Sequence, residues 1–310
     1  MSDEDYHADP ALGSTNLRKL ANNPSDYWYE SPFNPHREIE KVTPARTRGK
    51  AMHKLVLEGE PAFDQLYLCG PHHSEDMSPS EKGAATKAAN AKAAATGKIM
   101  LPAEDYDRIA ITAAMITKNP KLKTVFQNGA PEVSVFWAAD GVMYKTRFDY
   151  LKPRGIGDLK SITNTRDKPF PDACYDAIAN YRYDVQGAHY LDGRGQMAQL
   201  AADGCVYGQH DPDLLRKVVT SPEYAFQWIF FQSDKAPVTY SAILSPENAM
   251  VQLAREELAI ATQNYLRYMT EFGPDQMWLL IEDPQEIALE EMPGWFGRTR
   301  RTDRSRVRAA

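Results

Sequence analysis

Cysteine is scarce in this sequence: the 310 residues include only Cys69, Cys174 and Cys205, which lie far apart. An odd and scattered set argues against a disulfide framework and against a four-cysteine metal cluster, and it is typical of the reducing cytoplasm. The adjacent His72 and His73 have no cysteine or histidine partners at zinc-finger spacing. We therefore do not expect zinc, and we expect a cytoplasmic protein.

Long hydrophobic runs are also missing. No run approaches the roughly 20 apolar residues that a membrane-spanning helix needs. The acidic, polar start of the chain has no basic segment followed by an apolar one, so neither secretion nor a membrane partner is expected. The sequence contains no G-x-x-x-x-G-K-[ST] loop, which argues against an ATP-driven motor.

Charge is uneven along the chain. The net charge is −6, from 36 basic and 42 acidic residues, which taken alone argues against a protein that coats nucleic acid. However, residues 41–54 contain five basic residues and no acidic one, and residues 298–308 contain six arginines and one aspartate. Such segments can bind phosphate groups even on an acidic protein. The arginine tail is compatible with a disordered terminus or with a contact to a DNA backbone.

The hydrophobic pattern predicts a mixture of strands and helices. Strands are expected at residues 133–137, 142–151, 156–161, 225–232 and 238–244, and helices at 14–20, 47–57, 104–118, 172–191 and 246–272. This order predicts an α/β (α+β) fold with a central mixed β-sheet flanked by helices, in a single domain over residues 1–297 followed by a basic tail, 298–310. The first 11 residues are expected to form a loose tail, and the alanine-rich segment 74–98 an exposed helix or a mobile insertion.

Polar residues share one face of two predicted strands. Period-2 alternation places Lys145, Arg147 and Asp149 opposite the apolar residues of the first strand, and Asp158 and Lys160 on one face of the second. If these strands pair antiparallel, the two aspartates come within metal-binding distance. Two carboxylates are typical Mg²⁺ ligands, and an adjacent ammonium group can stabilise charge on a phosphate. A surface hairpin with a solvated ion pair is the alternative, because D-x-K tripeptides are common.

Several ordered motifs resemble those of one nuclease family. Asp149 and GDLKS at 157–161 resemble the D…(D/E)-x-K signature of the PD-(D/E)XK nuclease superfamily, and the chain is most similar to its RecE-type (exonuclease VIII-like) branch of phages and prophages. The other matching segments are LGSTNLRKL at 12–20 with PSDY at 24–27, GKAMH at 49–53, PEVSVFW at 131–137, K-x-R-x-D at 145–149, Y-x-x-Q-x-x-x-Y at 183–190, and Trp278 with PGW at 293–295. Segment 74–98, the arginine tail and Ser161, where threonine is usual, depart from the family pattern. The resemblance implies a restriction-endonuclease-like core.

The resemblance also implies a metal centre. His53, Asp149, Asp158 and the backbone carbonyl of Leu159 would bind two Mg²⁺ ions, for which Mn²⁺ could substitute. Taken by itself, a lone histidine such as His53 is more often a structural residue. Glu132 would add a carboxylate to the metal pair or its water molecules; alternatively, it is a solvated acid at a strand edge.

The remaining implied roles concern catalysis and DNA. Lys160 would orient the attacking water and stabilise the developing negative charge, and Gln186 would contact Lys160 or the scissile phosphate. Tyr190 shares a helix face with Gln186 and is equally compatible with catalysis and with core packing, whereas core packing is favoured for Tyr183. The predicted catalytic set is Glu132, Asp149, Asp158, Lys160, Gln186 and Tyr190. The predicted DNA contacts are Lys50, Lys54, Lys145 and Arg147.

By this resemblance, the protein is expected to be a Mg²⁺-dependent exodeoxyribonuclease that hydrolyses phosphodiester bonds of linear duplex DNA from its ends. The resulting overhangs would serve a single-strand annealing protein in recombination, and a homo-oligomer is a further expectation. Two alternatives stay open. One is an endonuclease or single-strand-specific nuclease on the same core, and the other is a catalytically silent DNA-binding protein.

Overall fold

The computed structural model describes residues 1–38 and 42–296. The chain divides into two compact units, Met1–Trp278 and Leu279–Ala310. In the second unit, the described residues contain one 3₁₀ turn, Leu289–Glu291. The arginine tail of residues 298–308, and Lys41 of the first basic segment, lie outside the described residues.

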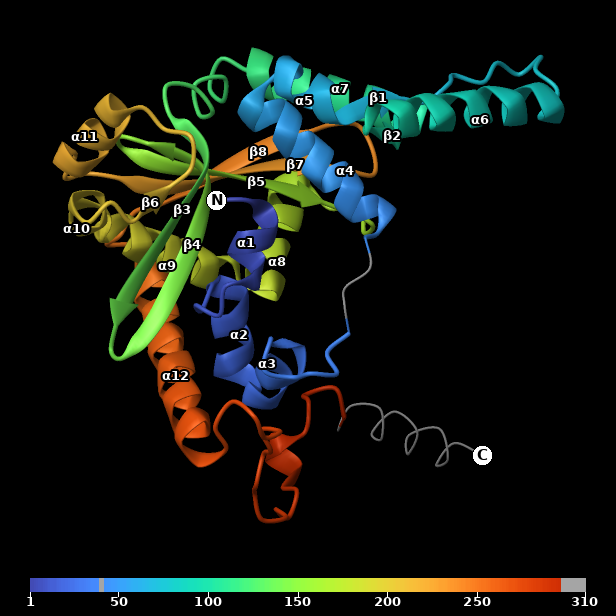
Figure 1. The fold of residues 1–310 in the computed structure, drawn as a ribbon. Helices are drawn as coiled ribbons and strands as arrows, with labels where there is room; N and C mark the ends of the chain where they lie inside the picture. Colours follow the sequence, from blue (N-terminus) through green and yellow to red (C-terminus); the bar gives the residue numbers. More distant parts are fainter. Residues whose placement is uncertain (39–41, 297–310) are drawn as a thin grey trace, which may run out of the picture. The chain divides into compact units, whose positions relative to one another are not determined.

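A six-stranded mixed sheet forms the centre of the first unit (Figure 1). Its strand order is β6-β3-β4-β5-β7-β8. Strands β3, β4 and β5 form an antiparallel meander, β7 runs parallel to β5, and β8 and β6 pair antiparallel at the two edges. The strands are β3 (Ala130–Ala139), β4 (Val142–Lys152), β5 (Gly155–Ile162), β6 (Val206–Tyr207), β7 (Ala225–Gln232) and β8 (Thr239–Leu244). The expected α/β architecture is confirmed.

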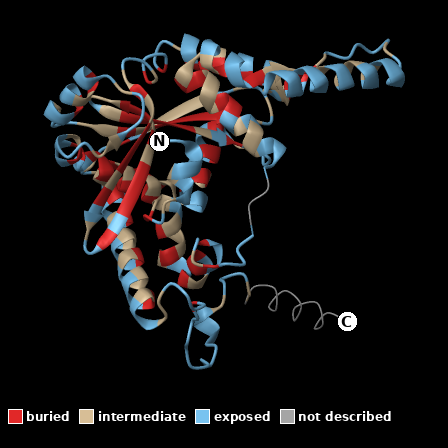
Figure 2. Cartoon of the chain, viewed as in Figure 1, coloured by how far each residue is buried: buried red, intermediate tan, exposed pale blue. Residues whose placement is uncertain are grey.

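Two hydrophobic cores lie against this sheet, and β7 shows why. Its sequence AFQWIFFQ is almost continuously apolar, which is typical of a strand buried on both faces. Phe226, Trp228 and Phe230 belong to one core, and Ile229 and Phe231 belong to the other. Figure 2 shows the central strands as mostly buried.

The larger core joins the sheet to helices from both ends of the first unit. Helix α9 packs on β3, β4 and β7, and the long helix α12 packs on both α9 and α2. The helices whose buried residues join this core are α2 (Ser14–Asn22), α3 (Pro24–Glu30), α8 (Phe170–Tyr181), α9 (Tyr183–Gly195), α10 (Met197–Ala202), α11 (Pro212–Thr220) and α12 (Ala249–Glu271). Trp278, at the end of the unit, is buried in the same core.

The second core is built from the segment before the meander. Helix α4 (Pro44–His53) continues directly into a π-helical turn, Lys54–Glu58, and α5 (Glu60–Leu66) and α7 (Ala103–Lys118) complete the layer. π-helical turns are frequent at functional sites, and this one begins immediately after His53. A pair of short parallel strands, β1 (Tyr67–Cys69) and β2 (Ile99–Leu101), lies beside this layer.

Three expectations about local structure need correction or completion. The predicted helix 172–191 is two helices, because Arg182 adopts a left-handed conformation (φ 52°) and its side chain binds Asp184 and Glu257. The alanine-rich segment contains an 18-residue helix, α6 (Pro79–Thr96), of which only Ala93 is buried. The first residues are not a loose tail: α1 (Asp3–Ala8) is a short helix capped by Ser2.

No helix within residues 1–38 and 42–296 is long and apolar enough to cross a membrane.

Candidate active site

Three acidic residues stand side by side on neighbouring strands of the sheet. Tyr150 of β4 pairs with Gly157 of β5, so the adjacent positions Asp149 and Asp158 lie next to each other. On the other side of β4, the pairs on either side of Glu132 place it opposite Asp149. The expected antiparallel pairing of the two aspartate strands is therefore confirmed, and β3 brings a third carboxylate to the same level.

Asp158 and Lys160 form a buried ion pair. Lys160 Nζ lies 2.7 Å from Asp158 Oδ2, and the exposed side-chain fractions are 17% and 0%. From helix α9, the Gln186 amide donates a hydrogen bond of 3.0 Å to Asp158 Oδ1. Burial raises the pKa of Asp158 to about 7, and the nearby Lys160 ammonium opposes this shift. Burial would lower the pKa of Lys160, but the carboxylates of Asp158 and Asp149 raise it above its ordinary value.

Asp149 connects this pair to helix α4. Its Oδ2 accepts a hydrogen bond of 3.0 Å from the backbone N–H of Leu159 and lies 3.6 Å from His53 Nδ1. The other ring nitrogen of His53, Nε2, lies 3.0 Å from the Leu159 carbonyl oxygen. The side chain of Leu159 packs into the second core, which leaves its backbone groups to these polar partners.

The donor set fits a hard divalent cation. Carboxylates of Asp149 and Asp158 and the Leu159 carbonyl supply the oxygen ligands that Mg²⁺ prefers. Asp158 Oδ2 pairs with Lys160 Nζ at 2.7 Å, and a carboxylate oxygen has a second lone pair that can bind a cation. His53 is placed to contribute a ring nitrogen. Because Nε2 now contacts the Leu159 carbonyl, ligation by both of these atoms would require that contact to open.

Glu132 and Tyr190 lie at the borders of this group. Glu132 has a positive φ of 53°, and burial together with the charge of Asp149 raises its pKa to about 8. Its carboxylate lies 4.0 Å from Arg147 Nε. The Tyr190 hydroxyl forms a hydrogen bond with Gln186 and interacts electrostatically with Asp149 and Asp158. The Tyr190 ring packs on Phe148 and Phe226. Tyr190 thus contacts the site and the core at once.

Tyr183 was predicted to pack in the core, and its ring does pack against that core. The ring also lies 5.5 Å from Lys160 Nζ, in cation–π geometry. Sequence reasoning missed this second contact, although Tyr183 lies on the same helix face as Gln186.

The predicted DNA contacts are engaged within the protein. Lys145 is only 6% exposed, and its ammonium group donates to the backbone oxygens of Tyr6 (2.6 Å) and Asp9 (2.8 Å). The N-terminal segment covers Lys145, so the predicted contact with DNA, which stays a prediction, would require that segment to move. Lys54 pairs with Glu58 of the π-helical turn.

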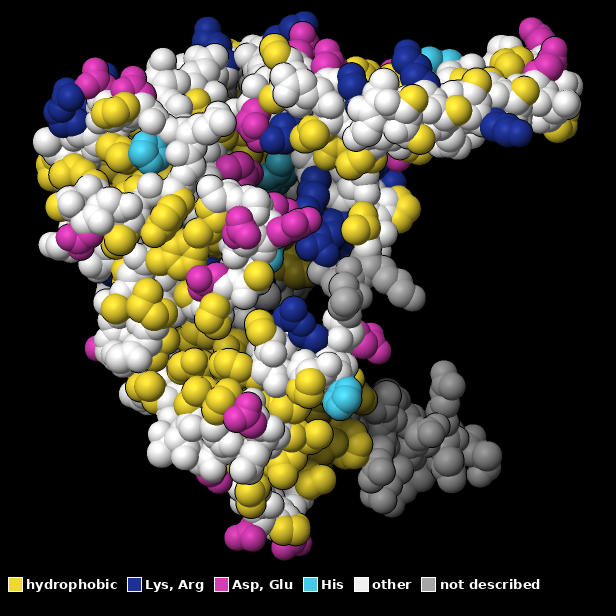
Figure 3. Space-filling model, in the orientation of Figure 1, with side chains coloured by type: hydrophobic (Ala, Val, Ile, Leu, Met, Phe, Trp, Pro, Cys, Tyr) yellow, Lys and Arg dark blue, Asp and Glu magenta, His cyan; other side chains and the backbone are white. Residues whose placement is uncertain are grey.

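Arg147 and Lys50 meet the same N-terminal segment. Asp3 of α1 pairs with Lys50 (2.6 Å) and Arg147 (3.1 Å), and Arg147 also donates to the Ser2 carbonyl and Ser134 Oγ. The Arg147 guanidinium lies 4.3 Å from the centre of the Tyr6 ring. Figure 3 shows basic and acidic side chains adjoining at the centre of this face. Sequence reasoning missed α1, although Ser2 followed by three acidic residues is a typical helix start.

Comparison with known proteins agrees with this geometry. Residues 34–204 match the family described as "PDDEXK-like domain of unknown function (DUF3799)". The chain belongs to this family. It is accordingly a member of the PD-(D/E)XK nuclease superfamily, and the matched residues include every predicted metal ligand and catalytic residue. The match does not single out the RecE-type branch.

A solved structure shares the fold of this PDDEXK-like protein. It is titled as a "Putative exonuclease" from Eubacterium rectale, and it aligns with a TM-score of 0.54 at 14% identity over 86% of this chain and 85% of the other. Among curated proteins, none matches the sequence.

Proposed function

We propose that this protein is a Mg²⁺-dependent exodeoxyribonuclease of the RecE type, which digests linear duplex DNA from its ends. The observation that carries the proposal is the meeting of Asp149, Asp158 and Lys160 at the centre of the sheet. Asp158 is fully buried, with Lys160 Nζ beside Oδ2 and the Gln186 amide donating to Oδ1, and Asp149 stands next to it on the neighbouring strand. Two neighbouring carboxylates beside a single ammonium group leave negative charge, which a divalent cation would neutralise.

In this proposal each residue has a separate task. Mg²⁺, when bound, would lower the pKa of a water molecule and stabilise charge on the phosphate. Asp149 and Asp158 would hold the ions, with the Leu159 carbonyl and His53 beside them. Lys160 places a positive charge next to Asp158, where it stabilises a phosphate that gains negative charge. Gln186 is a positioning residue, because its amide fixes the orientation of the Asp158 carboxylate.

The finer parts of the proposal rest on the sequence resemblance. They are attack from DNA ends, cooperation with a single-strand annealing protein, assembly into a homo-oligomer, a cytoplasmic location, and the use of two Mg²⁺ ions with Mn²⁺ as substitute. The rival on the same core is an endonuclease or a single-strand-specific nuclease. The rival of another class is a DNA-binding protein without catalysis.

The test compares one plasmid in linear duplex and in covalently closed duplex form, with a single-stranded circle as a third substrate, each incubated with the protein and Mg²⁺. Loss of the linear form only, abolished in Lys160→Ala but retained in the matched control Lys217→Ala at an exposed position of α11, supports the proposal. Cutting of both forms indicates the endonuclease, and digestion of a single-stranded circle alone indicates the single-strand nuclease. If a correctly folded protein cuts neither form but retards DNA in a gel, the binding protein replaces the proposal.

A further inference from the structure

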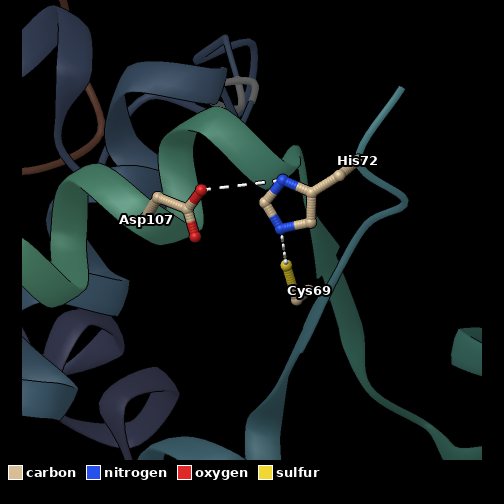
Figure 4. A group of neighbouring side chains, drawn as sticks. All are labelled: Cys69, His72 and Asp107. Atoms are coloured by element: carbon tan, nitrogen blue, oxygen red, sulfur yellow. Dashed lines mark hydrogen bonds and ion pairs between the residues drawn. The ribbon is translucent and has the colours of Figure 1, made fainter. Parts of the chain in front are cut away.

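A second group of side chains of the types that bind metal ions consists of Cys69, His72 and Asp107 (Figure 4). Cys69 ends β1, His72 lies in the loop that follows, and Asp107 lies on α7. His72 Nε2 is 3.9 Å from Cys69 Sγ, and His72 Nδ1 is 3.7 Å from Asp107 Oδ2. Within residues 1–38 and 42–296, this is the one set of three such side chains whose ligand atoms all lie within 4.8 Å of one another.

The backbone holds two of the three side chains in place. Cys69 pairs with Leu101 across the parallel strands, and the next N–H, of Gly70, donates a hydrogen bond of 2.8 Å to the Leu101 carbonyl. A Cβ on Gly70 would lie only 2.9 Å from that oxygen, so glycine is required for this close approach. Helix α7 begins two residues after Leu101 and carries Asp107. Strand pairing therefore fixes the start of α7 relative to Cys69.

The third side chain is free to adjust. His72 and Asp107 are 65% and 53% exposed, so solvent reaches the group and the His72 ring can turn about its Cβ–Cγ bond. The neighbouring His73 has a different partner, Thr86 of α6, at 3.3 Å. His72 alone is thus directed at the cysteine and the aspartate.

We propose that Cys69, His72 and Asp107 form a binding site for one zinc-class divalent ion, with a water molecule as the fourth ligand. A thiolate, an imidazole nitrogen and a carboxylate oxygen are the three ligand types that Zn²⁺ takes in proteins. In tetrahedral zinc geometry, such ligand atoms lie about 3.3–3.5 Å apart. The separations of 3.9 and 3.7 Å involve the two different ring nitrogens of His72, of which one ion can bind only one. With one nitrogen as ligand, the three ligand atoms lie within 4.8 Å of one another, so they need to approach by at most about 1.5 Å. Rotation of the two exposed side chains can accommodate this approach.

The same three residue types could instead form an activated thiol. A reactive cysteine needs surroundings that stabilise its thiolate, such as a nearby positive charge. Here Cys69 Sγ lies 3.3 Å from the Gly70 carbonyl oxygen, and Asp107 adds a negative charge to the group. These surroundings disfavour a free thiolate, whereas a divalent cation would supply the missing positive charge. The ion would link the loop after β1 to α7, and the next residue of that loop, His73, contacts Thr86 of α6.

This arrangement shows why the sequence argued against zinc. Zinc-finger spacing requires paired cysteines or histidines, which the sequence around His72 lacks. The structure instead places Cys69 three residues before His72 and adds Asp107 from a later helix. The third ligand type is an aspartate, which has no recognisable spacing in the sequence.

The test is a Co²⁺ titration of the reduced, chelator-treated full chain in excess Mg²⁺, which occupies oxygen-rich sites. The expected result is sulfur-to-cobalt charge-transfer absorption that saturates at one ion per chain and disappears when one equivalent of Zn²⁺ is added. Only a cysteine ligand produces this absorption, so the result does not depend on nuclease activity. Absence of the band in the wild-type protein would overturn the proposal.

Variants assign the ligands. Cys69→Ser should abolish the band, and the matched control Cys205→Ser should retain it, since Cys205 is another partly exposed free cysteine. His72→Ala changes an exposed loop residue and leaves the core intact, so it covers the case in which Cys69→Ser does not fold. It should weaken Co²⁺ binding at least about 10-fold. A band that survives in Cys69→Ser, or unchanged affinity in His72→Ala, would contradict the site.

Discussion

The two groups of candidate metal ligands differ in both donor type and burial. The central group consists of oxygen donors with one histidine, and strands β4 and β5 and helices α4 and α9 hold each member by hydrogen bonds. The peripheral group has a sulfur donor, and two of its three side chains are mostly in solvent. A hard cation suits the first group and a thiophilic cation the second. Burial makes the central side chains rigid, and exposure leaves the peripheral ones adjustable.

The largest expected effect is the loss of nuclease activity when the central group loses a carboxylate. Asp149→Asn keeps the shape of the side chain but removes the charge that lies beside His53 and the Leu159 N–H. We expect the rate of nucleotide release from linear duplex DNA at saturating Mg²⁺ to fall on the order of 100- to 1,000-fold. Asp172→Asn, an exposed aspartate in the first turn of α8, is the matched control. An unchanged rate in Asp149→Asn would remove the central group from the reaction.

The next effect compares a buried and an exposed histidine. His189 is 2% exposed, its Nε2 lies 2.9 Å from the Lys145 carbonyl oxygen, and burial lowers its pKa to about 4. Between pH 6.5 and pH 4 the unfolded chain binds a proton at this residue and the folded protein does not. The free energy of unfolding should therefore fall by about 3 kcal/mol on acidification through this window, with no further loss from His189 below pH 4.

Urea denaturation at several pH values measures this effect. His189→Gln should show a shallower loss of stability between pH 6.5 and pH 4 than the wild-type protein does. His36→Gln, at an exposed histidine outside both groups of candidate metal ligands, is the matched control. Parallel curves for wild type and His189→Gln would mean that His189 titrates normally in the folded protein.

Zinc should stabilise the folded protein by binding to the peripheral group and not to the central one. At a free Zn²⁺ concentration about 100 times the dissociation constant, an ion that binds the folded state alone adds about 2.7 kcal/mol to the free energy of unfolding. We expect this gain in the wild-type protein and in Cys205→Ser, and its loss in Cys69→Ser. Chemical denaturation with and without Zn²⁺, in excess Mg²⁺, measures it. A gain that persists in Cys69→Ser would place the zinc elsewhere.

The smallest effect concerns the N-terminal helix beside the central group. Asp3 pairs with Lys50 and Arg147, two of the predicted DNA contacts. Asp3→Asn should tighten binding to duplex DNA about two- to fivefold at low salt, because exposed ion pairs contribute at most about 1 kcal/mol. The gain should shrink as salt screens the charges. Glu4→Gln, which removes the neighbouring charge on the same helix, is the control, and an equal gain in both variants would indicate net charge as the cause.

Strongly patterned elements could be predicted from the sequence, and weakly patterned ones could not. The apolar run of β7 was placed at residues 225–232, as the structure has it, and the alternating meander predicted the Asp149–Asp158 pairing. The three-residue strands β1 and β2 are too short for a periodic signal. The break between α8 and α9 depends on Arg182, whose left-handed conformation is accompanied by ion pairs to Asp184 and, from a distant helix, Glu257.

From the sequence alone, five of the six strands of the sheet, its longest helices and the order of the acidic residues could be predicted, because these depend on short-range periodicity and on motifs within single strands. Only the tertiary structure decided which charges meet. It buried Lys145 under the N-terminal segment, brought His53 to Asp149 and Leu159, and joined Cys69 to Asp107. Each of these contacts joins elements far apart in the chain or buries a polar group. Packing of whole helices on the sheet therefore sets them, and no local pattern encodes them.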